Sequence, residues 1–217
     1  MPDALHSHIL FTHDHLAARL DRASAMPHTP GQPRKAAEHI DSLLAATAQH
    51  LAGVDAVLLP RVRHAAADGG RVVHDYLHTA RDLELALAHV KAREYGSVYD
   101  VGRSWKAVWN DVAVALARQR EAEHALVDRL AVGLDPAALG RLSDRLHAAE
   151  LAAPSRPHPY APHTGLPGMV ARRVLHLVDS FWDTTESRMV PEPVRPPHGP
   201  RGRMTQYLLA DPRFDEE

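Results

Sequence analysis

The periodicity of apolar residues is the feature of this sequence that most constrains its fold. Apolar side chains recur at i, i+4 and i+7 through most of the first 150 residues, and no segment alternates apolar and polar residues as a strand does. Helices are expected over residues 3–24, 34–67, 71–94 and 102–132, with a shorter one over 135–151. Short turns around residues 68–70 and 95–97 favour antiparallel neighbours. The pattern predicts an all-α protein, an antiparallel up-down four-helix bundle with additional C-terminal helices.

The prolines and glycines divide the chain into four parts. Residues 1–152 are expected to form the bundle and the shorter fifth helix, and Pro60 is the point where the second helix ends or kinks. Residues 153–168 are rich in proline and histidine and read as a linker, 169–190 as an amphipathic helix, and 191–217 as an irregular tail. We expect the helix over 169–190 to pack on the bundle or to pair with a second copy in a homodimer.

Composition excludes several classes of function. The 217 residues include no cysteine, so a metal site must use His, Asp or Glu. The net charge of −2 gives no electrostatic basis for binding nucleic acid. The N-terminus lacks the features of a signal peptide, and no uninterrupted apolar run approaches the roughly 18 residues of a membrane span. A cytoplasmic protein without a membrane span is the expectation.

Four polar residues fall inside the apolar stripes of three expected helices: His50, Glu84, Gln119 and Glu123. Burying a carboxylate costs several kcal/mol unless a partner compensates its charge. Side chains of this kind, from facing helices at mid-length, are the usual way in which a helical bundle holds one or two metal ions. On the first helix His15 is the expected fourth ligand, because it lies nearer to the middle than His8. Gln119 is either a weak ligand or a hydrogen-bond donor to a ligand.

A salt-bridge network without metal is the alternative. Arg81 lies one turn before Glu84 and Arg120 follows Gln119, so guanidinium groups could neutralise the buried acids. Other residues are weaker candidates for a metal site. His74 and His78 have the i, i+4 spacing of a ligand pair but point away from the apolar stripe, and Asp55 also points off it, toward solvent.

The sequence resembles the hemerythrin-like, HHE cation-binding family, whose members are four-helix bundles with a non-heme di-iron site. The segment Thr12-His13-Asp14-His15-Leu16 is similar to the family's first-helix motif, with His15 as the ligand. The segment from His50 to Pro60 is similar to the second-helix motif, including the closing proline. The segment from Gln119 to Glu123 falls where the fourth helix of the family has His-x3-Glu. The linker and last helix are similar to tails of bacterial members.

The chain departs from the family pattern on three helices. Val54 stands where the family has a bridging Glu, and Gln119 stands where it has a His. On the third helix the position facing the core is Glu84, where the family has His residues. Three options remain open: a mononuclear site, an unusual dinuclear site with His15, His50, Glu84 and Glu123, or a vestigial site. The resemblance implies iron, as one or two ions, or another divalent metal.

These observations favour a hemerythrin-like, non-heme metal-binding protein that senses or acts on dioxygen, peroxide or nitric oxide. Two other functions are compatible with the same residues. The first is an iron-dependent oxidoreductase acting on a small molecule, at the open coordination positions of the metal. The second is a metal-free helical interaction module whose site is vestigial.

Overall fold

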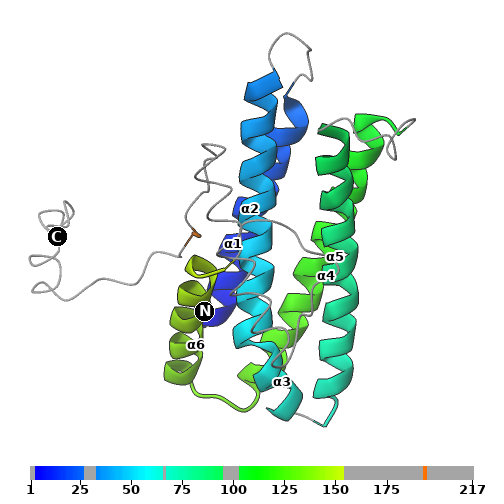
Figure 1. Ribbon diagram of the computed structural model, residues 1–217. Coiled ribbons are helices and arrows are strands. Elements are labelled where there is room, and N and C mark those ends of the chain that lie inside the picture. The colour runs from blue at the N-terminus through cyan, green and yellow to red at the C-terminus, as the bar shows by residue number, and fades with distance from the viewer. Residues whose placement is uncertain (1–2, 27–32, 66, 95–102, 154–192, 195–217) are drawn as a thin grey trace, which may run out of the picture.

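The computed structural model describes residues 3–26, 33–65, 67–94, 103–153 and 193–194, and this part of the chain is all-α (Figure 1). Its helices are α1 (Ala4–Ala25), α2 (Pro33–Val57), α3 (Leu59–Ala65), α4 (Gly69–Glu94), α5 (Trp105–Ala131) and α6 (Pro136–Leu151). The expected all-α class is confirmed for these residues. The expected linker 153–168, the amphipathic helix 169–190 and the tail 191–217 lie outside the described residues, apart from Ala153, Pro193 and Val194.

Helix starts agree with the polar residues that precede them. The side chain of Asp3 accepts hydrogen bonds from the backbone N–H groups of Leu5 and His6 at 2.9 and 3.0 Å. Ser104 accepts from Ala107 N and Asp135 from Ala138 N. These oxygens satisfy N–H groups of the first turn that have no partner within the helix. The start expected at Asp135 is therefore confirmed.

The expected helix 34–67 is two helices. Helix α2 ends at Val57 and α3 begins at Leu59, so the break precedes Pro60 by two residues. Proline has no N–H to donate to the preceding turn, and it disfavours the helical conformation of the residue before it. The chain nevertheless continues in nearly helical form, because the N–H of Leu58 still bonds to Val54 O at 2.8 Å.

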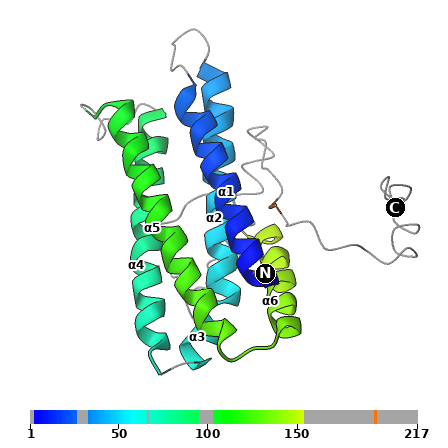
Figure 2. The same cartoon turned by 180° about the vertical axis from the view of Figure 1, so that it is seen from behind.

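The four long helices lie side by side, as the views in Figures 1 and 2 agree. Helix α1 packs against α2 and α5, α4 packs against α5, and α2 also contacts α4. One continuous core of buried apolar side chains lies among them, with contributions from α3 and α6. Helix α3 closes one end by contacts with α4 and α5.

Helix α6 packs on the outside of α1 and α2 and contacts both helices. It approaches α2 closely at Gly53, where an added Cβ would lie 2.7 Å from Glu150 Cγ and 3.2 Å from Leu146 Cδ1. A side chain at position 53 would force the two helices apart, so glycine permits this contact. The consequence is that Glu150, near the end of α6, reaches the interior.

One stretch of helix, Ala37–Ala65, is long and apolar enough to cross a membrane by length and composition alone, with a mean hydropathy of 1.4 over 18 residues. Of that window, 78% is buried inside the protein. Burial of this kind is what a core helix shows, so the stretch is weak evidence for a span.

Candidate metal centre

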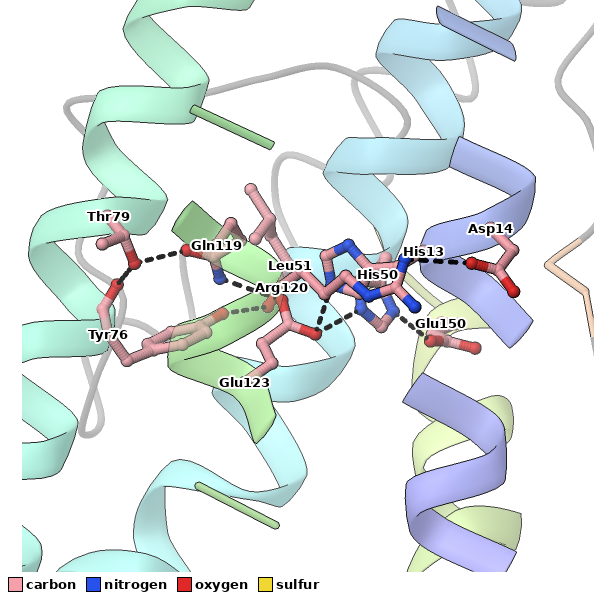
Figure 3. A network of polar contacts seen from close by, with 10 residues as sticks. All are labelled: His13, Asp14, His50, Leu51, Tyr76, Thr79, Gln119, Arg120, Glu123 and Glu150. Atoms are coloured by element: carbon pink, nitrogen blue, oxygen red, sulfur yellow. Dashed lines mark hydrogen bonds and ion pairs between the residues drawn. The ribbon is translucent and has the colours of Figure 1, made fainter. Parts of the chain in front are cut away.

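Three side chains from three helices converge in the interior: His13 from α1, His50 from α2 and Glu123 from α5 (Figure 3). One potential ligand atom from each lies within 4.8 Å of the others. Glu123 Oε2 is 3.0 Å from His13 Nε2 and 2.7 Å from His50 Nε2. The exposed fraction is 2% for each histidine and zero for the glutamate. The arrangement places two imidazole nitrogens and one carboxylate oxygen around a single point that is sealed from solvent.

Helix α6 supplies a second buried carboxylate next to this group. Glu150 Oε1 lies 2.7 Å from His50 Nδ1, so the His50 ring stands between two carboxylates, with one at each nitrogen. The other oxygen of Glu150 is 3.2 Å from His8 Nε2. His8 Nδ1 in turn lies 3.0 Å from Ser143 Oγ on α6. His8, which we had set aside for His15, thus belongs to the interior network.

The second oxygen of Glu123 is held by an amide. Gln119 Nε2 donates to Glu123 Oε1 at 2.9 Å, and Gln119 Oε1 accepts from the hydroxyl of Thr79 at 2.6 Å. These two bonds define which end of the Gln119 amide faces the carboxylate. Gln119 therefore occupies the position of a hydrogen-bond donor to a ligand, one of its two expected roles.

Burial and charge act in opposite directions on the central histidine. Burial alone lowers the pKa of His50, but the carboxylates of Glu123 and Glu150 outweigh it and raise the pKa to about 10. For Glu123, burial raises the pKa, but His50 and His13 outweigh it, and the pKa lies well below its usual range. For Glu150, burial is likewise outweighed by the neighbouring imidazoles of His147, His50 and His8, and the pKa is lowered.

The single positive charge of a protonated His50 does not balance the negative charges of Glu123 and Glu150. Glu123 and Glu150 are both ionised, which gives two negative charges, and a protonated His50 supplies one positive charge. An uncompensated buried charge is strongly unfavourable. A second positive charge in or beside the group, as another proton or as a cation, would balance the remaining negative charge.

The first helix contributes His13 rather than the expected His15. His15 is only half-buried, and its Nδ1 donates to the carbonyl of Phe11 at 2.8 Å. The apolar stripe of this helix runs through Leu5, Ile9 and Leu16. Because α5 packs on one side of that face and α6 on the other, the buried arc is wider and includes both His8 and His13.

Glu84 is buried, as expected from its place in the apolar stripe, but it is not among the three converging residues. Its charge acts on Tyr76: the pKa of that phenol is raised well above its usual value by burial, by Asp55 and Glu123, and to a smaller extent by Glu84. Asp55 itself is buried, so the expectation that it faces solvent is wrong.

The remaining candidates lie at the surface of α4. His74 and His78 are exposed and pair with neighbouring acids, Asp75 at 3.6 Å and Asp82 at 3.3 Å. Arg81 is exposed as well. These positions agree with the expectation that the two histidines point away from the core.

The arginine network considered as an alternative is absent from the described residues around Glu123 and Glu150. Arg120 pairs instead with Asp14 at the protein surface, 3.0 Å away (Figure 3). The carboxylates of Glu123 and Glu150 are contacted by histidines and, for Glu123, by the amide of Gln119. Histidines can exchange their protons for a metal ion, whereas guanidinium groups cannot.

Comparisons of the chain with protein-family models, curated proteins and solved structures gave no match.

Proposed function

We propose that this protein binds one divalent metal ion between His13, His50 and Glu123, and that the bound ion senses or acts on a small oxidant such as dioxygen, peroxide or nitric oxide. The observation that carries the proposal is the convergence of two imidazole nitrogens and one carboxylate oxygen on one buried point. This donor set excludes metals that require thiolates and suits iron(II), manganese or zinc.

The spacing of the three atoms fits a metal ion. With bonds of about 2.1 Å, adjacent ligand atoms around an octahedral ion lie about 3.0 Å apart. The separations of Glu123 Oε2 from the two histidine nitrogens, 3.0 and 2.7 Å, differ from that value by a few tenths of an ångström at most. The third separation, between the ligand atoms of the two histidines, is no more than 4.8 Å.

The charge of a divalent ion also fits. If the ion replaces the proton on His50 Nε2, its two positive charges balance the two ionised glutamates. Deprotonated His50 still carries a hydrogen on Nδ1, which it donates to Glu150. That bond fixes the tautomer in which Nε2 has a free lone pair and faces the centre. Gln119 similarly orients the carboxylate of Glu123.

Iron is the metal we favour, because two histidines and one carboxylate with open positions are typical of non-heme iron(II) proteins. When bound, such an ion supplies coordination positions at which a small oxidant can bind. The chain's own residues restrict what reaches it. The exposed fractions of His13, His50 and Glu123 are only 2%, 2% and 0%, so a diatomic or similarly small ligand is favoured over an organic substrate.

We further propose that the four long helices form the up-down, antiparallel bundle of hemerythrin type, with α6 as an addition. The contacts between helices support this topology, since each long helix packs against two others in the closed ring α1–α2–α4–α5–α1. In such a bundle, ligands from facing helices meet at one level. Here the second-helix and fourth-helix positions are His50 and Glu123, and Val54 leaves no carboxylate to bridge a second ion.

Metal analysis of protein produced with iron tests the proposal. We expect about one iron per chain in the native protein, and at least a roughly tenfold loss of iron affinity in His13→Ala and Glu123→Ala. His15→Ala is the matched control, since it removes a histidine from the same helix outside the converging group. Metal-free native protein that takes up neither iron(II), manganese nor zinc in titration would contradict the proposal and favour a vestigial site. Loss of metal in His15→Ala but not in His13→Ala would contradict the ligand assignment.

A further inference from the structure

A second concave site lies at the end of the molecule where α3, the end of α5 and the start of α6 meet (the lower part of Figure 1). Its volume is about 760 Å³. Pockets that bind small molecules usually measure about 300–1,000 Å³. None of its lining residues belongs to the group around His50, so it stands independently of the proposed metal centre.

The rim of this groove is positively charged. Three arginines line it, Arg61 from α3 and Arg141 and Arg145 from α6, together with His64, and none of the lining residues is acidic. Within the described part of the chain, no carboxylate forms an ion pair with any of the three arginines. Burial lowers the pKa of Arg61, and the nearby charge of Arg145 lowers it further. Like charges are thus held close together, which is unfavourable unless an anion joins them.

The floor of the groove is apolar. Leu130 and Leu142 are buried and Leu134 is half-buried, and all three line the same space as the arginines. One guanidinium is also fixed in place, since Arg61 Nη1 donates to Val57 O at 2.6 Å. A cationic rim above a leucine floor matches a molecule that has an anionic head and an apolar body.

We infer that this groove binds a small amphipathic anion, with a phosphate or carboxylate head on the arginines and a short hydrocarbon part on the leucines. Guanidinium groups suit both heads, because their planar N–H groups can donate two parallel hydrogen bonds to such oxygens. The leucines add affinity in proportion to the apolar area that the ligand buries.

Calorimetric titration with hexyl phosphate, hexanoate, inorganic phosphate and hexanol tests this inference and distinguishes the two heads. We expect one of the two amphipathic anions to bind the native protein at least tenfold more tightly than either inorganic phosphate or hexanol. Equal affinity for hexyl phosphate and inorganic phosphate would overturn the role of the leucine floor. No measurable binding of either amphipathic anion would overturn the whole inference.

Variants assign the binding to this groove. The double variant Arg61→Gln, Arg145→Gln is expected to lower the affinity for the tighter-binding anion at least tenfold. Arg145→Gln alone, at an exposed position, is expected to lower the same affinity. Arg129→Gln is the matched control, because Arg129 lies on α5 near the same end but pairs with Asp68 at 2.8 Å and does not line the groove. Unchanged affinity in both arginine variants, or equal weakening in the control, would overturn the assignment. Iron content should be unaffected in all three variants, which separates this site from the metal centre.

Discussion

At the scale of single residues, the protein is organised around His50. Each of its ring nitrogens faces a carboxylate from a different helix, Glu123 on α5 and Glu150 on α6. In the metal-free protein, the protonated ring joins the two acids. In the metal-bound state that we propose, Nε2 would become a ligand and only the bond to Glu150 would remain. Glu150 would then be a positioning residue that acts on the metal through His50.

Substitution of Glu150 tests this role. Glu150→Gln keeps an oxygen that can accept from His50 Nδ1 but removes the charge, so we expect metal affinity to fall less than in Glu150→Ala, where it should fall about tenfold or more. The measurement is a competition titration of each variant with iron(II) or zinc against a chelator. Ser143→Ala, which removes only the hydrogen bond to His8, is the control and should keep native affinity. Equal affinities in the native protein and Glu150→Ala would show that Glu150 does not orient the ligand.

At the scale of elements, the placement of α6 decides whether Glu150 reaches the buried group around His50. This helix begins at a clear sequence signal, Asp135 followed by Pro136, but nothing in its own sequence says which pair of helices it covers. Gly53 of α2 provides the contact surface, and the approach at this point carries Glu150 into the core. A neighbouring helix is thereby part of a site that the four long helices alone would leave incomplete.

Gly53→Ala is expected to separate α6 from α2 and to destabilise the fold. The added methyl would lie 2.7 Å from Glu150 Cγ, and such overpacking costs about 1–3 kcal/mol, against a gain of about 0.5–1 kcal/mol from replacing a helical glycine. Urea denaturation measures the net loss. Gly140→Ala on α6 is the control, since nothing lies within 4 Å of its added Cβ, and it should stabilise the protein. A stabilised Gly53→Ala variant with native metal affinity would contradict the close contact.

At the scale of the whole molecule, the buried network ties α1, α2, α5 and α6 together by charge as well as by apolar packing. In the metal-free protein, the attraction between these charges lasts only while His50 is protonated and both Glu123 and Glu150 are ionised. The network faces further titratable groups, His8 and His13 on α1 and His147 on α6. The free energy of unfolding therefore depends on pH through these interior groups.

The sign of this dependence follows from the pKa shifts. The pKa of His50 is raised from 6.5 to about 10, so its contribution is complete below 6.5 and is lost as the pH rises through 10. The pKa values of Glu123 and Glu150 are lowered from 4.5, so their contribution is present above 4.5 and is lost as the pH falls below it. Maximal stability of the metal-free protein is expected between pH 4.5 and 6.5. Denaturation with chelator present measures it, and His50→Gln should lack the alkaline loss. An unchanged alkaline profile in His50→Gln would show that His50 is not its source.

Much of the candidate metal centre could be predicted from the sequence, because a polar residue inside an apolar stripe is visible without coordinates. His50, Gln119, Glu123 and Glu84 were identified in this way, and all four are buried. His13 was missed because the buried face of α1 was taken to be as narrow as its apolar stripe. Glu150 was missed because a single acid on a short helix gives no signal of burial until the partner of that helix is known.

The sequence by itself determined the helices, their main starts and the polar residues that turn inward, since apolar periodicity and capping are local properties of the chain. Only the tertiary structure decided which of those residues meet. The width of a buried face depends on how many helices pack against it, and this placed His13 in the centre and left His15 at its edge. The position of α6 depends on a glycine nearly a hundred residues earlier in the chain, and this brought a second carboxylate to His50.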